Sequence, residues 1–148
     1  MKTINDVVKY MDSINPHDIE YEYNKLYFYE NDEWYEHILA AVKKNYGNVK
    51  RVVDVGSNYN VHGYMFENEG IEYIGVEKYL KKNHNPYTSN WIKYINKDYY
   101  EVRNEFKDDV IISNLCVGYL IPIEDVKAKH LIIGTVDEKG LCSAKILY

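Results

Sequence analysis

Cysteine is scarce in this chain, which has only two among its 148 residues, and proline and phenylalanine occur only three times each. Two cysteines are too few for a disulfide framework, which favours a reducing compartment. The length is nevertheless sufficient for a hydrophobic core that needs neither disulfides nor metals. We therefore expect one domain that spans residues 1–148.

Long apolar runs are also missing. No stretch approaches the roughly 18 apolar residues that cross a membrane, and the first eight residues, Met1 to Val8, lack the apolar segment of a signal peptide. These absences predict a cytoplasmic protein without a membrane partner. The net charge of −5 argues against generic nucleic-acid binding, because such binding relies on Lys and Arg to neutralise phosphates.

The second part of the chain, residues 49–148, contains short apolar runs separated by polar, helix-compatible stretches. This spacing predicts βαβ units in an α/β fold with a three-layer, mostly parallel sheet of about six strands. We expect the strand order 3-2-1-4-5, with an antiparallel last strand because the connection Asp137–Gly140 is too short for a crossover. The runs are Arg51–Val55, Glu72–Glu77, Trp91–Asn96, Asp109–Leu115, His130–Thr135 and Leu141–Leu147.

Two of these runs end in residues that suit a nucleoside. The first continues as Asp54-Val-Gly56-Ser57-Asn58-Tyr-Asn60, and the second ends as Ile-Gly-Val-Glu77. A glycine turn after a buried strand lets the backbone approach a ligand closely, and an acid after the next strand can accept hydrogen bonds from both ribose hydroxyls. The pair therefore favours a nucleoside site at the carboxyl ends of the strands.

These motifs resemble those of class I S-adenosylmethionine-dependent methyltransferases over residues 50–135. The resemblance implies a Rossmann-like methyltransferase fold with S-adenosylmethionine (SAM) as the cofactor. It places Asp54, Gly56, Ser57 and Asn58 around the methionine part of SAM and Glu77 at the ribose. Asp98, after the third run, would lie near the adenine, although it fits equally well as a helix N-cap. Ser113 closes the fourth run at the same edge.

The glycine loop departs from the family pattern, since Asn58 and Asn60 stand where glycine is usual. Asparagine tolerates a positive φ better than other residues with side chains, so the turn can form, but it adds atoms beside the methionine part. A nicotinamide site is disfavoured because the next glycine after Gly56 is Gly63. The five histidines are scattered, so no metal site is predicted.

Two functions follow from this reading. One is a SAM-dependent methyltransferase that acts on a small-molecule or peptidic acceptor. The other is a catalytically inactive methyltransferase-like protein that acts through protein–protein interaction, as the altered glycine loop and the short C-terminal part suggest. No residue is assigned as catalytic, because methyl transfer from an activated donor mainly needs alignment and a dry site.

Tyrosine is unusually abundant, with 17 in the chain, and residues 21–35 hold five of them. Residues 1–48 are predicted to form a helical cap with a break at Asn15-Pro16, but residues 21–29 fit either a strand or an aromatic loop. The tyrosines suit an acceptor lid, or a surface for a homo-oligomer or a protein partner. We expect Trp34 to pack against the sheet and at least two of Tyr21, Tyr23, Tyr27 and Tyr29 to line the opening above Gly56.

Overall fold

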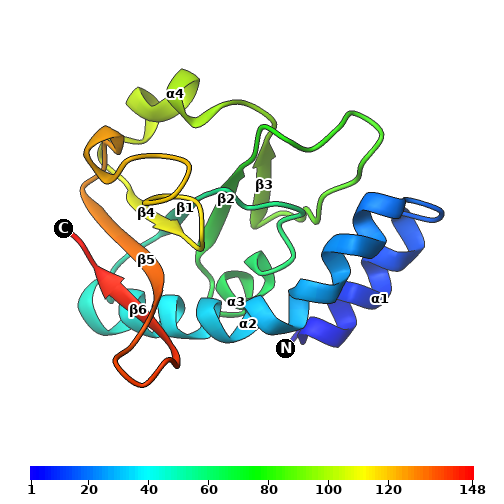
Figure 1. The fold of residues 1–148 in the computed structure, drawn as a ribbon, viewed down its shortest axis with the longest axis horizontal. Coiled ribbons are helices and arrows are strands. Elements are labelled where there is room, and N and C mark those ends of the chain that lie inside the picture. The colour runs from blue at the N-terminus through cyan, green and yellow to red at the C-terminus, as the bar shows by residue number, and fades with distance from the viewer.

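The structure is a computed structural model that describes residues 1–148. Six strands form one sheet in the order β3-β2-β1-β4-β5-β6 (Figure 1). The first five are parallel, and β6 runs antiparallel to β5. This confirms the predicted order and the predicted direction of the last strand. The strands are β1 (Arg51–Val55), β2 (Glu72–Val76), β3 (Ile92–Ile95), β4 (Val110–Ser113), β5 (His130–Val136) and β6 (Cys142–Ile146).

Two helices precede the sheet, α1 (Ile4–Ile14) and α2 (Ile19–Asn45). A capping box between Thr3 and Asp6 begins α1, and the Asp18 carboxylate begins α2 by accepting a hydrogen bond from the Tyr21 amide. The 27 residues of α2 run without interruption. Residues 21–29 are therefore helical, and the expectation of a strand or a loop there is wrong.

The burial pattern of α2 explains this correction. Its buried residues are Tyr21, Phe28, Tyr35, Ile38 and Val42. Four of them are seven residues apart, so they share one face of the helix. That face packs against β5, β6 and the helix α3 (Gly63–Asn68). None of the helices combines the length and the apolar composition that crossing a membrane requires.

The sheet carries a separate apolar cluster on each face. Because side chains alternate along a strand, Val52 packs with the α1, α2 and α3 layer, whereas Val53 packs with the opposite layer. That opposite layer holds the short helix α4 (Tyr99–Val102) and two single-turn 3₁₀ helices, Arg103–Phe106 and Ile123–Asp125. The result is a three-layer, Rossmann-like arrangement with reduced crossovers on one side (Figure 1).

Candidate functional site

The loop after β1 has the conformation that its sequence predicts. Gly56, Asn58 and Asn60 have φ values of 84°, 52° and 64°, so both asparagines take the left-handed conformation of the glycines they replace. A Cβ atom on Gly56 would lie 2.5 Å from the Cβ atom of Cys116. Glycine is needed at position 56 because the loops after β1 and β4 touch there.

Glu77 follows β2 and is held against this loop. One carboxylate oxygen accepts a hydrogen bond from the Asn58 amide at 3.0 Å, and the other accepts one from the Tyr79 amide at 3.1 Å. Each carboxylate oxygen has a further lone pair available. Glu77 is therefore a preoriented acceptor at the carboxyl ends of the strands, where ligands bind in such sheets.

A first cavity, of about 120 Å³, lies between the ends of β1, β2 and β3. Glu77, Asp98, Cys116 and Ile121 are among its walls, and we call it the Asp98 cavity. One Asp98 oxygen caps α4 by accepting from the Tyr100 amide, and the other lies 3.4 Å from the Lys78 ammonium. Asp98 thus serves as a helix cap and lines the cavity at the same time.

A second cavity, of about 190 Å³, lies on the α2 side of the loop, and Gly56 borders it as well. We call it the His62 cavity. The Asn58 side chain is turned toward α2, where it donates to the Asn24 amide oxygen at 2.8 Å. After β4, Leu115 has a φ of 65°, which is strained for a leucine. The cavity is also lined by Tyr27, Asn31, Tyr35, Ser57, His62 and Asn114.

A third cavity, of about 250 Å³, is bordered by Glu20, Asn24, Asn58, Tyr59 and Glu77; we call it the Glu20 cavity. It shares Glu77 with the Asp98 cavity and Asn58 with the His62 cavity. The three cavities therefore meet around the loop after β1. Their combined volume falls within the roughly 300 to 1,000 Å³ of small-molecule sites.

Asp54 lies beside these cavities and lines none of them. It is fully buried, and one of its oxygens accepts hydrogen bonds from the hydroxyls of Tyr35, at 2.7 Å, and Tyr73. The other oxygen has no partner. Burial raises the pKa of Asp54 to about 7, although the two hydroxyls act in the opposite direction. The carboxylate is thus engaged by two buried tyrosines and does not line the place that the sequence suggested for it.

The two predicted serines have different surroundings. Ser57 lines the His62 cavity, and its buried hydroxyl has no partner. It lies against Gly75, where a Cβ atom would be 2.5 Å from the Ser57 oxygen. Ser113 borders none of the three cavities, because its hydroxyl donates to the Val55 carbonyl at 2.9 Å and accepts from the Val117 amide at 3.0 Å. Ser113 therefore connects β1 to the loop after β4.

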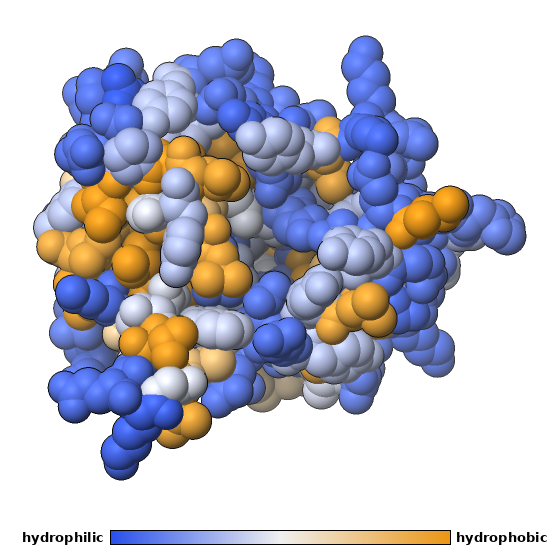
Figure 2. Space-filling view, in the orientation of Figure 1, coloured by the Kyte–Doolittle hydropathy of each residue, from blue (hydrophilic) through white to orange (hydrophobic).

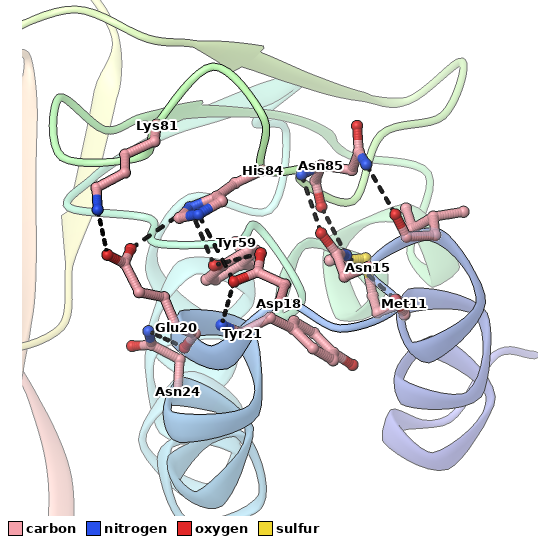
Figure 3. A network of polar contacts seen from close by, with 11 residues as sticks. Met11, Asn15, Asp18, Glu20, Tyr21, Asn24, Tyr59, Lys81, His84 and Asn85 are labelled. Atoms are coloured by element: carbon pink, nitrogen blue, oxygen red, sulfur yellow. Dashed lines mark hydrogen bonds and ion pairs between the residues drawn. The ribbon is translucent and has the colours of Figure 1, made fainter.

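A polar network joins the segment after Glu77 to the junction between α1 and α2 (Figure 3). The buried His84 imidazole lies 3.6 Å from carboxylate oxygens of both Asp18 and Glu20. Asn15 and Asn85 exchange two hydrogen bonds of 3.0 and 3.1 Å. These contacts hold the N-terminal helices against residues 81–85 and so fix the walls of the Glu20 cavity.

The surface near the site is apolar over the segment that joins β4 to β5 (Figure 2). Among the exposed residues of this segment are Leu115, Tyr119, Leu120 and Ile123. Leu120 also lines the Asp98 cavity, and Leu115 lines the His62 cavity. Each of these two cavities thus has an exposed leucine of this segment in its wall.

The tyrosines of α2 are placed differently from the prediction. Only Tyr27 among Tyr21, Tyr23, Tyr27 and Tyr29 borders the His62 cavity. Tyr21 is buried in the core, whereas Tyr23 and Tyr29 are exposed away from the cavities. The prediction that at least two of them line the opening is wrong. Trp34 does reach the sheet, where its indole donates to the Thr135 carbonyl of β5 at 2.8 Å.

One residue of the site, His62, was missed by the sequence reasoning. It follows the glycine loop directly and enters the His62 cavity only because α2 folds over that loop. A single histidine without a motif gives no signal of this position. No group of three or more His, Cys, Asp or Glu residues is arranged to hold a metal ion.

Comparison with known proteins gives similarity at the level of structure. The sequence matches no protein-family model and no curated protein. Magnesium protoporphyrin IX methyltransferase from Synechocystis PCC 6803, with bound SAH, aligns with a TM-score of 0.60 at 14% identity over 88% of this chain and 72% of that chain. The same enzyme with bound SAM aligns with a TM-score of 0.53 at 14% identity over 95% and 81% of the two chains.

A SAM-dependent methyltransferase from Archaeoglobus fulgidus aligns with a TM-score of 0.47 at 18% identity, over 76% of this chain and 59% of that chain. At sequence identities this low, the similarity shows only that the backbones are arranged alike. Together with the strand order and the antiparallel last strand, the alignments to the Synechocystis enzyme show that the chain has the Rossmann-like fold of class I SAM-dependent methyltransferases.

Proposed function

We propose that the protein binds SAM and transfers its methyl group to a small-molecule or peptidic acceptor. The observation that carries this proposal is the Glu77 carboxylate, which two backbone amides orient at the border of the Asp98 and Glu20 cavities. The fold neighbour from Synechocystis was crystallised with SAM and with SAH, which supports the same ligand class here.

The residues present fit the parts of SAM. Glu77 would accept hydrogen bonds from the ribose hydroxyls with lone pairs that its two amide partners leave available. The Asp98 cavity offers apolar walls from Val76 and Ile121 for the adenine and the Asp98 carboxylate for its exocyclic amine. Gly56 borders the Asp98 cavity and the His62 cavity. The amino-acid end of SAM would pass Gly56 and enter the His62 cavity beside Ser57 and Asn58.

Bound SAM supplies an activated methyl group, so the protein has to align the acceptor and exclude water. The acceptor would approach over the His62 cavity, between Tyr27 and Asn31 of α2 and Leu115 after β4. The apolar segment between β4 and β5 reaches this opening (Figure 2). An approach with Leu115 and Tyr27 at its border suits an acceptor with an apolar part.

The Glu77→Ala variant tests the proposal. We expect it to bind S-adenosylhomocysteine (SAH) roughly ten- to a hundredfold more weakly than the original protein, because hydrogen bonds to a charged carboxylate contribute about 1.5 to 3 kcal/mol. Isothermal titration calorimetry measures the change. Glu138→Ala, in the exposed turn before β6, is the matched control and should leave the affinity unchanged.

The alternative is a methyltransferase-like protein that binds a partner and no cofactor. The contact between Cys116 and Gly56 favours it, because this contact narrows the passage between the Asp98 and His62 cavities. Under this alternative, neither heat of binding nor a thermal shift would be seen with SAM or SAH at millimolar concentration. That result would contradict the methyltransferase proposal.

A further inference from the structure

The His62 imidazole has a fixed orientation in its cavity. It is 5% exposed, its Nε2 atom lies 2.8 Å from the Phe28 carbonyl oxygen, and its ring stacks on Tyr35 at 4.4 Å with an interplanar angle of 7°. A carbonyl oxygen can only accept a hydrogen bond, so Nε2 must carry the proton. Phe28 and Tyr35 both belong to α2, which therefore sets the orientation of the ring.

The opposite ring nitrogen is an unused acceptor. Burial lowers the pKa of His62 to about 4, so the ring is neutral near pH 7 and Nδ1 bears a lone pair. No protein group donates a hydrogen bond to Nδ1, since the only hydrogen bond of the ring is the one to Phe28. The nearest carboxylate, Asp32, lies on the Nε2 side at 3.9 Å. Nδ1 is thus free to accept a hydrogen bond from a ligand in this cavity.

We propose that Nδ1 of His62 binds the α-ammonium group at the amino-acid end of the cofactor. This inference rests on the proposed function, which places the ribose at Glu77 and leads the amino-acid end past Gly56 into the His62 cavity. Of the two charged groups at that end, only the ammonium can donate to Nδ1, because a carboxylate only accepts. His62 is therefore a binding residue that recognises the amino group.

The surroundings of His62 agree with this assignment. The Asp54 carboxylate is separated from the cavity by Tyr35, which stacks on His62 and donates to Asp54. A direct ion pair between the ammonium and Asp54 is therefore not available in this structure. The nearby amide side chains of Asn31 and Asn114 line the same cavity, and amide groups can pair with the carboxylate at the same end of the ligand.

The test compares two ligands that differ only in the amino group: SAH and its desamino analogue, S-(5′-adenosyl)-4-thiobutyric acid. His62→Phe is the variant to use, because phenylalanine keeps a flat ring that can stack on Tyr35 but has no hydrogen-bond acceptor at the position of Nδ1. The Phe28 carbonyl lies inside α2 and keeps its helical hydrogen bond. We expect SAH to bind roughly ten- to a hundredfold more weakly to this variant, as for the loss of a hydrogen bond to a charged group. The affinity for the desamino analogue should stay the same.

Two controls separate this inference from the proposed function. Glu77→Ala should weaken both ligands equally, and His130→Phe, at the opposite end of the strands where His130 stacks on Tyr46, should weaken neither. If the original protein binds neither ligand, the proposed function fails and this inference fails with it. If both ligands bind but His62→Phe weakens them equally or not at all, only the assignment to His62 is overturned.

A measurement without a variant covers the case in which His62→Phe does not fold. In protein labelled with ¹⁵N-histidine, the Nδ1 resonance of His62 should move when SAH is added and stay in place with the desamino analogue. The other four histidines serve as internal references. A resonance that moves equally with both ligands, or with neither, would overturn the assignment.

Discussion

Replacing Tyr21 with alanine should lower the free energy of unfolding by about 3 to 5 kcal/mol, the usual cost of removing a large buried aromatic side chain. Tyr21 is fully buried, with its ring 5.5 Å from that of Tyr59 and 5.8 Å from that of Phe28. Its hydroxyl donates to Asp12 of α1 at 2.8 Å. Chemical denaturation, followed by far-ultraviolet circular dichroism, measures the loss.

Tyr23→Ala is the matched control on the same helix, because Tyr23 is 62% exposed. Its effect should stay within about 0.5 kcal/mol, as for most surface substitutions. If both variants changed the free energy of unfolding only slightly and equally, Tyr21 could not be packed in the core. The whole aromatic segment would then fit a lid or a partner surface. The expected contrast assigns Tyr21 and Phe28 to the core and leaves Tyr23, Tyr27 and Tyr29 for contacts with ligands or partners.

The Asp54→Asn variant should become more stable relative to the original protein as the pH rises, by about 2 to 3 kcal/mol between pH 5 and pH 8. Burial raises the pKa of Asp54 to about 7 in the folded protein, from the 3.8 that is usual for an aspartate exposed to water. Between these values the unfolded chain has lost the proton and the folded protein retains it, so the original protein loses stability with rising pH until about pH 7. The Asp54→Asn variant does not titrate at this position, so it does not share this loss of stability. Denaturant unfolding at a series of pH values measures the difference.

Asp32→Asn provides the comparison for this pH series. Burial raises the pKa of Asp32 to about 6. The stability of Asp32→Asn relative to the original protein should therefore stop rising near pH 6, one pH unit below the corresponding point for Asp54→Asn. Titration of His62 and of the remaining groups is common to both variants and the original protein, so it cancels in the differences. A stability difference for Asp54→Asn that does not change with pH would show that the folded protein holds Asp54 ionised throughout.

Much of the sheet could be predicted from the sequence because its signals are local. Each parallel strand is a short apolar run, and the turn Asp137–Gly140 is too short for anything but an antiparallel return. The left-handed conformations of Asn58 and Asn60 were also predictable, since few other residues adopt them. Glu77 directly follows β2, so the length of the apolar run alone predicts its place at the carboxyl edge of the sheet.

The errors concern long-range partners. In α2 the tyrosines alternate with polar residues over a few positions, which imitates a strand, whereas the seven-residue spacing from Tyr21 to Val42 is visible only over the whole helix. Asp54 is placed correctly on β1, but the hydroxyls of Tyr35 and Tyr73 that engage it come from other elements. The same holds for His62, whose orientation depends on α2. Contacts of this kind are made by tertiary folding and leave no pattern near the residue itself.

The polar contacts that join the N-terminal helices to later parts of the chain have a consequence for synthesis on the ribosome. Lys2 bonds to Asn68 and Tyr87, and Asn15 bonds to Asn85, which is 70 positions later. At about 5 to 20 residues per second, α1 has to wait roughly 4 to 14 seconds after its own translation before these partners exist. Residues 68–87 therefore have to be translated before α1, the first of the elements described here to leave the exit tunnel, can complete its docking. Until then the apolar face of α1 lacks these neighbours and is open to a chaperone.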